Sequence, residues 1–100
     1  MAKVINITDK FSSAKPQIQL GEKIYTVNDS MATVLQFEEL ANTSTVESMS
    51  KAIEIALGKE AVSELNIEEI SVGNFKVLTI AIMAAMQGIE YEEAEKRFRL

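Results

Sequence analysis

The sequence predicts a mainly helical protein of the α+β class, with a small N-terminal β-hairpin and a compact bundle of about five short helices. Three observations predict this fold. A strand–turn–strand pattern lies in the first quarter of the chain. Helix-capping residues recur at intervals along the rest, and residues 77–86 are apolar except for Thr79. A helix that is apolar all round is normally buried, and crossing a bilayer takes about twenty apolar residues. We therefore expect a central helix over 75–87, covered by protein, and no membrane partner.

Length and composition predict a single domain over residues 1–100, with a hairpin region in 1–27 and a helical bundle in 28–100. The chain has no cysteine, which excludes disulfides, zinc–thiolate sites and thiol catalysis. It also has no histidine, the commonest general base and metal ligand near neutral pH. We therefore expect no catalytic site, no cofactor and no metal, and a protein that is not an enzyme.

The charge is divided unevenly along the chain. Residues 1–27 carry four lysines against two acidic residues, a net charge of +2, whereas residues 28–100 carry six basic against thirteen acidic residues, a net charge of −7. A negative body repels phosphate backbones, so no nucleic acid partner is expected. The N-terminus has only two consecutive apolar residues before Asn6, far fewer than a secretory signal needs, which indicates a cytoplasmic protein.

The hairpin is expected from two short apolar–polar segments, 17–20 and 24–27, that flank a glycine. Gly21 and Glu22 suit a two-residue turn whose first position needs a positive φ. A three-residue loop is the alternative, and it would place three apolar side chains on one face: Ile18, Leu20 and Ile24. Residues 4–7 could add a third strand, because an isolated hairpin is only marginally stable.

Capping residues set the expected helix boundaries. The first helix follows Asn28, Asp29 and Ser30 and ends at Asn42 and Thr43. The second begins at a capping box formed by Ser44 and Glu47 and ends at Gly58.

Three further helical segments complete the bundle. Residues 59–65 form a short helix with Ala61, Val62 and Leu65 inward, and a turn through 66–70 follows. The apolar helix starts at Ser71 or Asn74 and stops at Gly88. The last helix, 90–99, has acidic residues first and basic residues last, which complements the helix dipole, and its inward face carries Tyr91, Ala94 and Phe98.

Some motifs suggest chemistry but have structural explanations. Asp29, Ser30 and Met31 resemble the Asp-Ser-Leu site of acyl carrier proteins, yet a long helix precedes that serine in carriers and a hairpin precedes it here. A helix-capping role for Ser30 is favoured, and an acyl-carrier-like protein stays as an alternative. The glutamates of 90–95 form a solvated helix start rather than a calcium loop. A helix-turn-helix over 46–65 lacks the basic residues that reading DNA requires.

A partner-binding surface is the remaining functional hypothesis. Several methionines fall on the expected helices, and methionine is common on adaptable binding surfaces. Each of these residues could instead fill the core. The predicted partner-binding residues are Phe75, Leu78, Ile82, Met83 and Met86, with Met49 and Phe98 at the flanks.

The order of segments resembles the tail assembly chaperones of long-tailed bacteriophages or prophages. The resemblance covers residues 17–100 and lies in a Gly-Glu-Lys-Ile-Tyr hairpin at 21–25, a capped helix with Thr-Val-Leu at 33–35, and Leu-Gly-Lys-Glu-Ala at 57–61. It continues in Asn-Ile-Glu-Glu-Ile at 66–70 and in Ala-Ile-Met-Ala-Ala-Met-Gln-Gly at 81–88. A Glu-rich segment and Arg97-Phe98-Arg99 then end the chain.

This resemblance implies a non-enzymatic protein of the host cytoplasm that is absent from the mature virion. Its partner would be the hydrophobic tape measure protein, which it keeps soluble until the tail tube polymerises. The resemblance also implies a frameshifted longer form of the same protein as a partner. Apart from the resemblance, part of the apolar surface could be reserved for another copy of the chain, which would give a homo-oligomer. A small acidic helical regulatory protein, similar to an antitoxin, is the alternative from another class.

Overall fold

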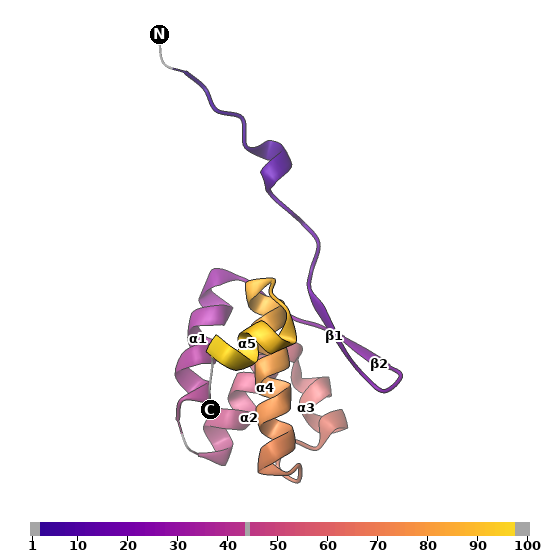
Figure 1. Ribbon diagram of the computed structural model, residues 1–100. Coiled ribbons are helices and arrows are strands. Elements are labelled where there is room, and N and C mark those ends of the chain that lie inside the picture. Colours follow the sequence, from indigo (N-terminus) through magenta and orange to yellow (C-terminus); the bar gives the residue numbers. More distant parts are fainter. Residues whose placement is uncertain (1–2, 44, 98–100) are drawn as a thin grey trace.

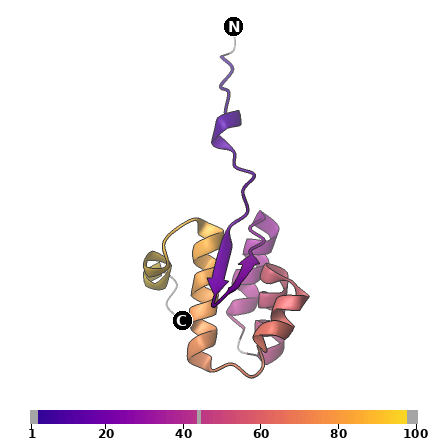
Figure 2. The same cartoon turned by 90° about the vertical axis from the view of Figure 1, so that its right-hand side faces the viewer.

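The computed structural model describes residues 3–43 and 45–97 and confirms the expected class. A single-turn 3-10 helix, η1 (Thr8–Lys10), precedes an antiparallel hairpin of β1 (Gln17–Leu20) and β2 (Lys23–Thr26). Helices then follow in the order α1 (Met31–Ala41), α2 (Val46–Leu57), α3 (Lys59–Leu65), α4 (Val72–Gln87) and α5 (Tyr91–Arg97). The helices form a bundle against which the hairpin lies, beside α4 and α3 (Figures 1 and 2).

Residues 3–16 form an N-terminal arm that extends away from the helical body (Figure 1). The third strand that residues 4–7 could have added does not form, since the sheet of the described residues has two strands. The Asn6 side chain explains the difference: its Oδ1 accepts hydrogen bonds from Thr8 N at 3.0 Å and Thr8 Oγ1 at 2.7 Å. This local turn bends the backbone into η1 and competes with an extended strand.

The hairpin has the two-residue turn rather than the three-residue loop. Leu20 pairs with Lys23, and Gly21 has a φ of 64°, as the first position of such a turn requires. Ile18 pairs with Tyr25, so both lie on the face that carries Leu20. Ile24 lies on the opposite face and is exposed, so the turn type decides which apolar side chains meet the helices.

Side-chain caps fix three helix starts. Ser30 Oγ accepts from Thr33 N at 3.2 Å, and Ser71 Oγ accepts from Asn74 N at 3.0 Å, so α4 starts after Ser71. In α2 the cap is Thr45, whose Oγ1 accepts from Ser48 N at 3.1 Å. The capping box predicted from Ser44 and Glu47 is therefore wrong by one position, and Ser44 itself lies outside the described residues.

The predicted helix stops are confirmed. Asn42, Gly58 and Gly88 are the C-caps of α1, α2 and α4. Gly88 adopts the left-handed conformation, with a φ of 68°, and its N–H bonds back to the last turn of α4. The final helix starts one residue later than expected, at Tyr91.

The main core lies between the end of the hairpin, α1, α2, the turn at 66–70 and the second half of α4. Its buried members are Val27, Phe37, Ala52, Ile53, Ala56, Ile67, Ile82 and Met83. A smaller cluster joins α4 to α5 through Ile80, Ala84 and Ala94, with Tyr91 packed against it. Because α4 contributes to both clusters, it takes the central position expected of it. In α3, Ala61 is buried, and Val62 and Leu65 pack against the main core as expected.

Across residues 3–43 and 45–97, length and hydropathy qualify no single helix as a bilayer span. The pair α4 and α5 meets the criteria together, with a bend of 105° between the two helices.

Candidate functional site

The central helix α4 is exposed in its first half and buried in its second. Val72 and Val77 are 74% and 52% exposed, whereas Ile82 is 0% and Met83 is 7% exposed. An exposed valine is unremarkable by itself, but here the exposed side chains of α4 line two neighbouring apolar grooves. These grooves form the candidate functional site.

The first groove, called the α2–α4 groove, lies where the starts of α2 and α4 meet the turn at 66–70. It has a volume of about 240 Å³. Met49 of α2 and Phe75 of α4, two of the predicted partner-binding residues, line it together, and both are half-buried. The exposed side chains of Val46 and Val72 flank them. The lining is Val46, Met49, Ile67, Glu68, Ile70, Ser71, Val72 and Phe75.

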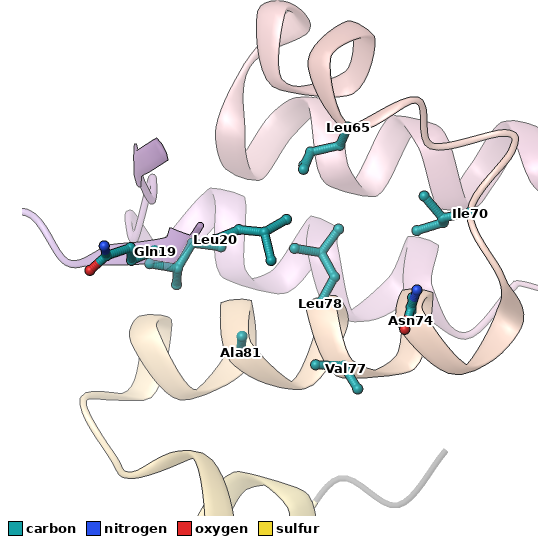
Figure 3. A pocket seen from close by; sticks show the side chains of 9 residues that line it. Gln19, Leu20, Leu65, Ile70, Asn74, Val77, Leu78 and Ala81 are labelled. Atoms are coloured by element: carbon teal, nitrogen blue, oxygen red, sulfur yellow. The ribbon is translucent and has the colours of Figure 1, made fainter. Parts of the chain in front are cut away.

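The second groove, called the hairpin groove, lies between the tip of the hairpin and the facing sides of α3 and α4 (Figure 3). It has a volume of about 290 Å³, and its only polar side chains are those of Gln19 and Asn74. The apolar lining is Ile18, Leu20, Leu65, Ile70, Val77, Leu78 and Ala81. Ile70 belongs to both grooves, so the two adjoin each other at the turn at 66–70.

The structure divides the predicted partner-binding residues into distinct environments. Phe75 and Met49 lie in the α2–α4 groove, and Leu78 lies in the hairpin groove. Ile82 and Met83 are buried in the main core, and Met86 packs against that core without lining either groove. Phe98 lies outside the described residues. The candidate surface therefore shifts toward the start of α4.

Among the lining residues that sequence reasoning missed, four are large, apolar and exposed: Leu20, Val46, Val72 and Val77. Val46 and Val72 each follow directly after a capping residue. A side chain in the first turn of a helix has no preceding turn to lie against, because helical side chains point back toward the N-terminus. An apolar residue that directly follows a helix N-cap is therefore expected to be exposed, and this signal could have identified Val46 and Val72 from the sequence.

An ion pair holds the hairpin against α3. Lys23 Nζ of β2 pairs with the Glu64 carboxylate of α3. The hydrogen bond that Lys23 donates to Glu64, together with the negative charge of that carboxylate, raises the pKa of Lys23 above 10.5. The pair links the tip of the hairpin to α3, and Leu20, beside the same turn, lies at the edge of the hairpin groove.

Ser30 has a structural role in this chain. Its hydroxyl accepts from Thr33 N and donates to Thr33 Oγ1 at 2.9 Å, which closes the first turn of α1. A hairpin precedes it where a carrier protein has a helix. Among the described residues, no three acidic side chains come close enough together to hold a metal ion.

Comparison with protein-family models, curated proteins and solved structures gives no match to this chain. The two grooves and the sequence pattern are therefore the features of this chain that bear on its function.

Proposed function

We propose that this protein is a non-enzymatic tail assembly chaperone that binds apolar helical segments of a tape measure protein in the host cytoplasm. The observation that carries the proposal is the meeting of Met49 and Phe75 in the α2–α4 groove. These two residues are 26 positions apart in the sequence and come from different helices.

The groove suits an apolar helix as its ligand. An amphipathic helix presents anchors at positions i, i+3, i+4 and i+7, which enter a hydrophobic groove between helices. Met49 supplies a flexible, polarisable side chain that adapts to different anchors along a long client. Phe75 supplies a large rigid surface, which favours tight local contact.

The size of the groove favours weak and reversible capture. A volume of about 240 Å³ lies just below the range of about 300–1,000 Å³ that is typical of small-molecule pockets, and it admits only a few side chains. Each copy then contributes modest affinity, and several copies along one client give strong overall binding. Such binding is readily reversed when tail-tube subunits compete for the client.

The charge of the body supports the same role. Residues 28–100 carry a net charge of −7, so a complex with its apolar surfaces covered keeps a charged exterior. Net charge of this size opposes aggregation. The turn at 66–70, one of the segments that resemble the chaperone family, supplies Ile67, Glu68 and Ile70 to the α2–α4 groove.

Co-expression with the tape measure protein encoded by the same phage or prophage tests the proposal. The variants M49K and V72K place a charge in the groove at positions that are not fully buried, and M31K is the matched control on exposed α1 surface. We expect the client to stay soluble with the wild type and with M31K, and to aggregate with M49K or V72K. Circular dichroism verifies that each variant is folded. A client that stays soluble without this protein, or equally with V72K, contradicts the proposal.

A further inference from the structure

The N-terminal arm carries four large apolar side chains that nothing in the described structure covers. Val4, Ile5, Ile7 and Phe11 are between 51% and 89% exposed. Single exposed apolar residues are common, but four within eight positions on a projecting segment form a concentrated apolar ligand.

The hairpin groove offers a site of matching chemistry on the body. Two of its apolar side chains, Leu20 and Val77, are more than half exposed. The groove volume of about 290 Å³ accepts large aliphatic or aromatic side chains of an extended segment. Most of its lining lies outside the α2–α4 groove, so occupation of one leaves most of the other free.

The arm and the body also have complementary charge. Lys3, Lys10 and Lys15 against Asp9 give residues 3–16 a net charge of +2, and the body carries −7. Beside the groove itself Glu64 is paired with Lys23, and Glu69 and Lys76 adjoin the lining residues Ile70 and Val77, so the attraction comes from the net charge of the body. A basic apolar segment is thus attracted to the body as a whole.

We propose that the arm of one copy lies in the hairpin groove of a second copy, so that the chain associates with itself through exchanged arms. The direction of the arm favours a second copy over its own body. The arm leaves β1 at Gln17, the end of the hairpin opposite the turn, and points away from the helices in both views (Figures 1 and 2). Leu20, at the turn, lies at the far end of the same strand.

An exchange of arms between two copies makes two identical joints and closes a two-fold dimer. Each joint covers the apolar arm of one copy and the apolar groove of the other. The inference does not depend on the identity of the client, because it uses the hairpin groove rather than Met49 and Phe75.

Light scattering after size exclusion, and sedimentation velocity over a dilution series, measure self-association of the full chain. The double variant I7S/F11S removes apolar arm side chains that contact nothing in the body, and V77K places a charge in the groove. L35K is the matched control on exposed α1 surface. We expect each of the first two to weaken dimerisation by about tenfold or more, as loss of an interface anchor does, and L35K to leave it unchanged.

Mixing distinguishes exchange between copies from folding back within one copy. The arm variant I7S/F11S keeps an intact groove, and V77K keeps an intact arm, so a mixture regains one joint per pair. We expect the mixture to form a heterodimer while each variant alone is monomeric. A monomeric wild type, dimers unaffected by I7S/F11S, or a mixture that stays monomeric each overturns the inference.

Cross-linking gives a second measurement that does not depend on affinity. The chain has no cysteine, so disulfides form only between introduced residues. Mixing F11C with V77C under mild oxidation is expected to give an 11–77 disulfide between two chains, and F11C with L35C is the control pair. Cross-linking at equal rates in both pairs overturns the inference. V72K changes the α2–α4 groove and not the hairpin groove, so it is expected to lose client binding and to keep dimerisation. The chaperone proposal and the dimer proposal can therefore fail independently.

Discussion

The two halves of α4 have opposite environments, and their compositions differ in the same sense. Residues 72–78 line grooves at the surface, whereas residues 79–86 supply the centre of the core and the contact with α5. The first half contains Gly73, Asn74 and Lys76, whereas the second is apolar except for Thr79, and only the second half belongs to the cluster with α5. The apolar sequence of a helix predicts that it is buried, and the packing of the neighbouring elements determines how much of it is buried.

The largest expected effect is a loss of stability on truncating a buried side chain in the second half of α4. Ile82→Ala removes a side chain that is fully buried in the main core and leaves a cavity there. We expect the free energy of unfolding to fall by about 2–5 kcal/mol, as measured by urea denaturation. That loss is a large share of the stability of a small domain. A loss below about 1 kcal/mol would mean that this half of α4 is not closely packed.

The next largest expected effect is a gain in stability on removing a buried hydroxyl in the second half of α4. Thr79 Oγ1 is buried and has no hydrogen-bond partner among the described residues. Thr79→Val keeps the shape and removes the unpaired group, so we expect the free energy of unfolding to rise by about 1 kcal/mol. Thr33→Val is the matched control, because Thr33 Oγ1 accepts from Ser30 Oγ and its loss lowers stability. Thermal unfolding of both variants checks the opposite signs.

Local capping chemistry made the helix ends predictable from the sequence. Ser30, Ser71 and Gly88 act through bonds within one turn of themselves, so the sequence around each contains the relevant information. The error at Ser44 has the same origin, since Thr45 is an equally good cap one position later. The missing third strand shows the limit of pattern alone, because the Asn6 side chain bends a segment whose apolar content is typical of a strand.

Within residues 77–86, the division of α4 into core and groove was not predictable from the pattern. Periodicity orients a helix only when polar residues mark one face, and residues 77–86 have a single polar residue, Thr79, which is itself buried. Ile82 and Leu78 are therefore equivalent in the sequence and differ only through contacts made by distant segments. Met49 and Phe75 were predicted as binding residues by type, but their meeting in one groove depends on how α2 and α4 pack.

Val72→Ala in the first half of α4 sharpens the comparison with Ile82→Ala. Val72 is largely exposed, and alanine is the better helix former, so the free energy of unfolding is expected to change by less than about 0.5 kcal/mol. Urea denaturation measures both substitutions under one set of conditions. A loss comparable to that of Ile82→Ala would contradict the division of the helix, since it would show that Val72 is covered in the free protein.

The smallest expected effect concerns the ion pair that anchors the hairpin beside the first half of α4. Lys23 has a raised pKa in the folded state because it bonds to Glu64, so its contribution to stability is fully present below the unfolded value of 10.5. That contribution is lost as the pH rises through the higher folded value. The stability difference between wild type and Lys23→Gln is therefore expected to be small and constant near neutral pH, to begin to fall above pH 10.5, and to vanish only above the higher folded pKa. Added salt should reduce the same difference, because both side chains are partly exposed.

Denaturation of both proteins across this pH range measures the stability difference, and Lys51→Gln is the control for an exposed pair within one helix. A difference that persists at high pH would assign the role of Lys23 to packing of its aliphatic stem, and the hairpin would then be held by apolar contact alone.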